Sequence, residues 1–176
     1  MKIIKCKVSF LAVFIFAFFL PFHEVGASPQ SVEIIVNFSN SMNEIAGNKS
    51  KIDIARELVN GVLDKISGPS DVGLSFYGHS DKNNCDDAEL LVPIRGIDKQ
   101  AIKQMLAQFK PMGKASADNA LLKAAERLKG NNDYRNVILI TDGGKTCDGD
   151  LLKTVRELKK VYDFRYVTCG PAQYSE

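Results

Sequence analysis

Histidine is scarce in this sequence, and two common glycine-containing motifs are missing. His23 lies in the N-terminal segment, so catalysis by a Ser/His or Cys/His pair would depend on His79 alone. No Gly-x-Ser-x-Gly turn precedes a predicted helix, and the turn after the first predicted strand lacks Gly-x-Gly-x-x-Gly. These absences weigh against a serine hydrolase and against a dinucleotide-binding domain.

The chain also lacks an apolar run long enough to cross a bilayer as a helix. Val8–Leu20 spans about 13 residues, whereas a transmembrane helix needs roughly 20. Lysines precede this run and the small residues Val25-Gly26-Ala27 follow it, as in a secretory signal peptide. We therefore predict cleavage after Ala27, a secreted or periplasmic location, and one domain in residues 28–176 without stable membrane insertion.

An excess of charge of one sign is absent as well once the N-terminal segment is removed. That segment takes three lysines and one glutamate with it, so residues 28–176 hold 20 basic and 20 acidic residues. A balanced charge gives no electrostatic reason to expect binding to nucleic acid or to an anionic membrane.

What the chain does contain is an alternation of apolar strands and amphipathic helices. Helices are predicted over residues 52–66 and after the caps Asp98, Ser116 and Asp150. Strands are predicted at Val32–Val36, Val72–Tyr77, Leu90–Val92 (an edge strand before Pro93), Val137–Ile140 and Phe164–Val167. This order predicts an α/β fold, a mainly parallel central sheet with helices on both faces.

Polar residues follow two of these strands directly. Asn37-Phe38-Ser39-Asn40-Ser41 comes after the first strand, and Thr141-Asp142-Gly143-Gly144 after the fourth. Ligands bind at the carboxyl ends of strands in open α/β sheets, and hydroxyl and carboxylate oxygens are ligands that Mg²⁺ accepts. We expect both segments to meet at one edge of the sheet, together with residues 111–118.

These motifs resemble those of von Willebrand factor A domains. The first is similar to the Asp-x-Ser-x-Ser signature of that family, with Asn37 in place of the aspartate. Val137–Gly144 is similar to its fourth-strand motif, and Pro111–Leu121 to its middle Gly-x-Thr-Pro-Leu loop. The resemblance implies the Rossmann-like fold of the family, here expected to be truncated at the C-terminus and to lack the last strand and helix.

The resemblance also implies a metal-ion-dependent adhesion site, in degenerate form. The five family positions hold Asn37, Ser39, Ser41, Ala115 and Asp142. The amide of Asn37 removes a charge whose pairing at 4 Å is worth roughly 4 kcal/mol at an effective dielectric of 20, and Ala115 has no side-chain oxygen. Ser116 is a weak substitute, since a helix cap is its simpler role. Binding of Mg²⁺ or Mn²⁺ is expected to be weak or lost.

The three cysteines that remain after cleavage point to a disulfide, because export brings a chain into an oxidising compartment. Cys85 and Cys147 both fall in loops at the ligand-binding edge, which favours a bond between them. A Cys147–Cys169 bond is the alternative.

The predicted function is the binding of another protein that offers an acidic side chain, without catalysis. Two alternatives stay open. One is a structural subunit of an envelope complex, and the other is a secreted hydrolase that uses His79 with a nearby serine or Cys169.

Overall fold

The computed structural model describes most of the chain after the predicted signal peptide. Residues 1–27 and Ala115 lie outside the described part. The described residues are 30–80, 84–114, 116–130, 134–144 and 147–161. Residues 164–169 are described by their backbone alone. Within these ranges, no helix is both long and apolar enough to span a membrane.

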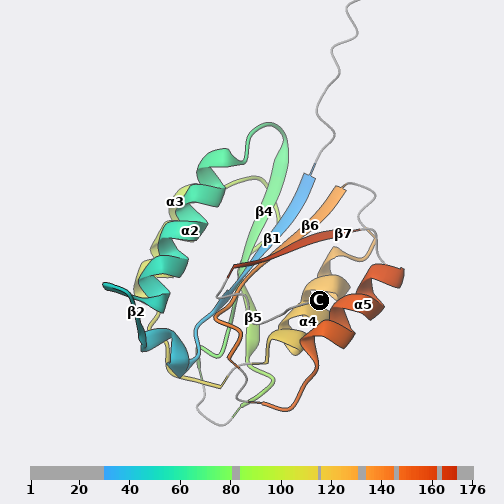
Figure 1. Cartoon of the computed structure of the whole chain (residues 1–176). Coiled ribbons are helices and arrows are strands. Elements are labelled where there is room, and N and C mark those ends of the chain that lie inside the picture. The colour runs from blue at the N-terminus through green and yellow to red at the C-terminus, as the bar shows by residue number, and fades with distance from the viewer. Residues whose placement is uncertain are drawn as a thin grey trace, which may run out of the picture.

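A five-stranded sheet forms the middle layer, in the order β5-β4-β1-β6-β7 (Figure 1). β1 pairs in parallel with β4 and β6, β6 pairs in parallel with β7, and β5 runs antiparallel to β4 at the edge. The strands are β1 (Gln30–Asn37), β4 (Ser70–Tyr77), β5 (Ala88–Val92), β6 (Tyr134–Ile140) and β7 (Phe164–Cys169). The predicted mainly parallel sheet and the edge position of the strand before Pro93 are confirmed.

Two helices cover each face of the sheet (Figure 1). α2 (Lys51–Lys65) and α3 (Lys99–Gln108) lie on one face, and α4 (Ala117–Leu128) and α5 (Leu151–Val161) on the other. Helices on both faces are what crossover connections between parallel strands require.

Three helices begin at residues that were predicted to be N-caps. Asp98 and Asp150 each accept a hydrogen bond from the backbone amide three residues later, at 2.9 and 3.0 Å, as predicted. Ser116 occupies the N-cap position of α4 but makes no side-chain cap. Its hydroxyl instead donates to Asp118 Oδ1 at 3.0 Å, because a carboxylate in the first turn is a strong acceptor. The predicted cap by the Ser116 hydroxyl is therefore wrong.

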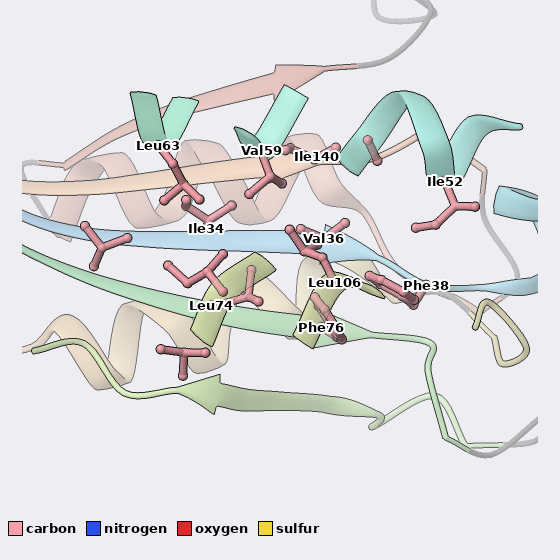
Figure 2. Packing of buried hydrophobic residues seen from close by; sticks show 14 of the residues in the cluster. Ile34, Val36, Phe38, Ile52, Val59, Leu63, Leu74, Phe76, Leu106 and Ile140 are labelled. Carbon is pink, nitrogen blue, oxygen red and sulfur yellow. The ribbon is translucent and has the colours of Figure 1, made fainter. Parts of the chain in front are cut away.

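The core is divided by β1 into two layers. Ile34 and Val36 point toward α2 and α3, where Val59 and Leu63 of α2 pack against them (Figure 2). Ile35, between them in the strand, points to the opposite layer under α4 and α5. Burial on both faces explains why the strand is an almost continuous β-branched run.

Two short elements between β1 and α2 have no counterpart in the predicted order. They are the 3-10 helix η1 (Asn40–Asn43) and a hairpin of β2 (Ile45–Ala46) and β3 (Lys49–Ser50). Gly47 allows the tight turn of the hairpin, with a φ of +71°. Elements this short carry no detectable hydrophobic period, so sequence patterns do not reveal them.

A charged side chain lies in the core layer under α4. Glu33 of β1 is fully buried, and its carboxylate accepts hydrogen bonds from Arg127 of α4 and from the Ser75 hydroxyl. Arg127 Nε reaches the second carboxylate oxygen at 3.2 Å, so the contact is bidentate. A buried carboxylate is tolerated here because each of its oxygens has a hydrogen-bond donor.

We expect Arg127→Met to lower the free energy of unfolding by about 3–5 kcal/mol, because it leaves Glu33 buried without a counter-charge. Lys129→Met is the matched control, since Lys129 pairs with Glu126 at 4.0 Å on the surface. That substitution should cost no more than about 1 kcal/mol. Urea unfolding measures both values, and equal losses would contradict the role assigned to the buried pair.

Candidate functional site

Asn37, the last residue of β1, connects two strand ends. It is fully buried, and its side-chain oxygen accepts a hydrogen bond from the Ser39 amide at 2.8 Å. Its side-chain nitrogen donates to Asp142 Oδ1 at 3.0 Å. An ionised aspartate at position 37 has no hydrogen to donate to Asp142. The amide therefore changes this position into a link between β1 and the loop after β6.

The two predicted hydroxyl ligands lie side by side. Ser39 Oγ and Ser41 Oγ are 3.0 Å apart. Ser39 is fully buried and follows Phe38, whose ring stacks on Phe76 with the centroids 3.9 Å apart. Ser41 belongs to η1, and this short turn brings its hydroxyl back toward the strand end. The convergence predicted for these serines is present.

Asp142 is the carboxylate on which these groups converge. Its side chain is 4% exposed, Oδ1 accepts from Asn37 and from the Gly144 amide, and Oδ2 lies 3.0 Å from Lys51 Nζ. Burial alone would raise the pKa of the Asp142 carboxyl, but hydrogen bonds from Lys51, Ser41 and Gly144 outweigh it. The pKa therefore lies below its ordinary value, and Asp142 is ionised at neutral pH.

Lys51 supplies the opposite charge, and sequence reasoning missed it. Its ammonium, at the first residue of α2, also binds Glu44 Oε2 at 2.7 Å. The hydrogen bond to Glu44, supported by the contacts with Asp142 and opposed by burial, raises the pKa of Lys51 above its ordinary value. The available signal was the capping pattern Ser50-x-x-Asp53, which starts a helix at this edge with Lys51 as its first residue.

The middle loop reaches β1 at Gly113. This residue forms a parallel bridge with Ser39, and its amide donates to the Gly78 carbonyl at 2.9 Å. Gly78 has a φ of +71°, and a Cβ there would lie 2.6 Å from the Lys114 carbonyl oxygen. The three predicted loops thus meet, whereas the hydroxyl of Ser116 is engaged with Asp118 instead.

A disulfide joins Cys85 and Cys147, with their Cα atoms 5.9 Å apart. The structure therefore contains the first of the two predicted pairings and not the alternative Cys147–Cys169 bond. The neighbouring Asp86 accepts a hydrogen bond from Asn119 of α4 at 2.6 Å. The loop between β4 and β5 is therefore held both to α4 and to the loop that follows Asp142.

His79, on which the hydrolase alternative depends, is buried just after β4. Nε2 lies 3.3 Å from Glu89 Oε2, and Nδ1 lies 3.2 Å from Asp87 Oδ1 without hydrogen-bond geometry. The ring packs edge-on against Phe76 and Phe109. Both ring nitrogens therefore face carboxylates.

The contacts at the carboxyl edge of the sheet determine how well this site fits a divalent cation. Asn37 and Ser41 hydrogen-bond Asp142, Ser39 contacts Ser41, and Lys51 lies on the second oxygen of Asp142. No cluster of three or more His, Cys, Asp or Glu side chains suited to a metal occurs among the described residues. Mg²⁺ requires an octahedral shell of oxygen atoms. One carboxylate with hydroxyls and waters could supply such a shell, but the Lys51 ammonium already lies on Oδ2 of Asp142 and would repel a dication there, so the site as folded fits poorly.

A match to a family model identifies the family. The model of the von Willebrand factor type A domain matches residues 32–145, and the chain belongs to that family. The uncharacterised protein YwmD from Bacillus subtilis is 26% identical over 138 residues, which are 73% of this chain and 62% of that protein. The chain thus spans about three fifths of the length of this relative.

Solved structures show the same fold. The von Willebrand factor type A structure from Catenulispora acidiphila matches with a TM-score of 0.64 and 19% identity, over 82% of this chain and 33% of that one. The pilus adhesin SpaC from Lactobacillus rhamnosus GG matches with a TM-score of 0.57 and 19% identity, over 68% of this chain and 16% of that one. At these identities the likeness establishes the fold.

Gly78→Ala is expected to lower stability by at least about 1 kcal/mol, because the new Cβ meets backbone at a positive φ. Gly61→Ala is the matched control, since a Cβ at that position of α2 meets nothing within 4 Å. It should raise stability by about 0.5–1 kcal/mol, the helix preference of alanine over glycine. Thermal and urea unfolding measure both, and a neutral Gly78→Ala would show that the loop can move away from β1.

The lowered pKa of Asp142 makes part of the stability dependent on pH. This contribution is present above the pKa of the unfolded chain and is lost as the pH falls through the lower pKa of the folded state. Asp142→Asn should cost about 1.5–3 kcal/mol at neutral pH, as expected for hydrogen bonds to a charged group, and should weaken the pH dependence in acid. Urea unfolding between about pH 7 and pH 2 measures this.

Asp64→Asn, at an exposed position of α2, controls for the general effect of removing a carboxylate. The free energy of unfolding of the Asp64→Asn variant should change with pH as that of the wild type does. If Asp142→Asn does the same, the ionised Asp142 does not stabilise the fold.

Proposed function

We propose that this chain is an adhesion-type domain that binds another protein through the carboxyl edge of its sheet, with weak or absent dependence on divalent cations. The observation that carries the proposal is the convergence of three loops at this edge. The Asn37–Asp142 hydrogen bond and the Ser39–Gly113 bridge hold these loops together, and the Cys85–Cys147 disulfide attaches the loop between β4 and β5 to them. Loops fixed on a rigid scaffold are where binding residues concentrate.

We propose a location outside the cytoplasm. The Cys85–Cys147 disulfide supports it, because such bonds persist in oxidising compartments. The signal-peptide pattern of residues 1–27 supports it independently. SpaC is described as a pilus adhesin, and a similar role for this chain is part of the proposal.

The partner is proposed to present an acidic side chain. Lys51 holds two carboxylates: that of Asp142, whose side chain is 4% exposed, and that of Glu44, whose side chain is 65% exposed. Exposed ion pairs are weak, so the contact with Glu44 can be exchanged at little cost, whereas Asp142 stays in place. A carboxylate of the partner would take the position of Glu44 on the Lys51 ammonium.

The proposal assigns no catalytic role to this chain. The only histidine of the sequence outside the N-terminal segment is His79, and its two ring nitrogens lie near Asp87 and Glu89. Burial of the ring against Phe76 and Phe109 supports a structural role for this side chain.

The experiment begins with a photo-crosslinking amino acid at Met112, an exposed residue of the middle loop, and at Ser67, an exposed residue near the opposite edge. Crosslinks to a partner should form from position 112 and not from position 67. The affinity of the partner identified in this way is then measured with and without EDTA. Glu44→Gln should raise it by up to about fivefold, since it removes an internal competitor worth no more than about 1 kcal/mol.

Glu57→Gln is the matched control, because Glu57 pairs with Lys49 on the surface in the same kind of contact. It should leave the affinity unchanged, and EDTA should have little effect on any variant. Equal crosslinking from both positions would contradict binding at the loop edge. Equal effects of Glu44→Gln and Glu57→Gln would contradict the exchange of carboxylates on Lys51.

A further inference from the structure

We propose that the ammonium group of Lys51 is the resident cation of this site and takes the role that a divalent metal has in related domains. The inference refines the proposed function, because it names the group that carries the positive charge at the binding edge. It can nevertheless be tested on the isolated protein, without any partner.

The position of Lys51 is the first part of the argument. Its Nζ lies 3.0 Å from Oδ2 of Asp142, the one carboxylate kept from the predicted metal site. The lysine side chain is 23% exposed, whereas the side chain of Asp142 is 4% exposed, so the lysine is the member of the pair that solvent reaches more easily. It thus lies between a buried acidic group of the domain and the exposed carboxylate of Glu44. A bridging metal ion would join two carboxylates in the same way.

The hydrogen bonds around Asp142 are the second part. Its Oδ1 accepts from the Asn37 side chain at 3.0 Å and from the Gly144 amide at 3.1 Å. Its Oδ2 accepts from Lys51. A metal ion binds oxygen lone pairs, and the lone pairs of Asp142 are directed at these three N–H donors and at the Ser41 hydroxyl. A cation could enter only by displacing the lysine and breaking part of this network.

The balance of charge is the third part. Among the groups just described, the buried carboxylate of Asp142 is opposed by one ammonium, and Asn37 is neutral. A dication placed beside Asp142 would meet the like charge of Lys51 within a few ångström. The neutral residue at position 37 is consistent with this arrangement, because a single positive charge needs only one buried carboxylate.

The test is Mn²⁺ binding, measured by calorimetry and by paramagnetic broadening of the Ser39 and Gly144 amide resonances. Wild type, Asn37→Asp and Lys51→Met should show no binding. Asn37→Asp combined with Lys51→Met should gain Mn²⁺ binding that calorimetry can measure. Asn37→Asp with Lys49→Met is the matched control, since it removes the same charge from a surface pair two residues away. It should behave as Asn37→Asp alone.

Mn²⁺ binding by the wild type would overturn the proposal, and so would equal affinities of the Lys49 and Lys51 double variants. Ala115→Thr is added to the Lys51 double variant to supply the remaining oxygen of the family pattern. If that folded triple variant still binds no Mn²⁺, Lys51 is not what replaces the metal and the proposal fails. Lys51→Gln replaces Lys51→Met if the latter does not fold. None of these outcomes bears on the crosslinking result, which tests the proposed function separately.

Discussion

The burial of β1 on both faces constrains the rest of the molecule. The strand lies between β4 and β6, and every residue from Ser31 to Asn37 is buried. A polar group in such a strand must find its partner inside the protein. Glu33 pairs with Arg127 under α4, and Asn37 pairs with Asp142 at the carboxyl edge. The core and the candidate site therefore follow the same rule.

The same rule explains the electrostatics of the edge. The side chain of Asp142 is 4% exposed and ionised, so it needs hydrogen-bond donors and is stabilised further by a positive charge beside it. In this chain a lysine meets that need, and the lysine leaves one exposed contact, with Glu44, facing solvent. A fold can keep its strand topology while the charged group at its binding edge changes, so family membership alone does not establish cation dependence.

Several features of the site were predictable because they follow from local sequence and simple topology. The carboxyl ends of β1 and β6 are adjacent, so polar residues directly after them had to meet, as Asn37 and Asp142 do. The pairing of Cys85 with Cys147 was one of two predicted pairings, because both residues follow strands at that edge. The N-cap position of Ser116 was predictable from sequence, whereas the choice of Asp118 as the partner of its hydroxyl depends on rotamers.

The order of the longer helices and strands, the parallel sheet and the two polar loops can be derived from the amino-acid sequence, since periodicity and turn residues act over a few neighbouring positions. The partner of each buried charge cannot be derived from the sequence. Lys51 and Asp142 are separated by 91 residues, and Glu33 and Arg127 by 94. A long flexible side chain can reach any of several carboxylates, so only the packing of α2 and α4 against the sheet determines which pairs form.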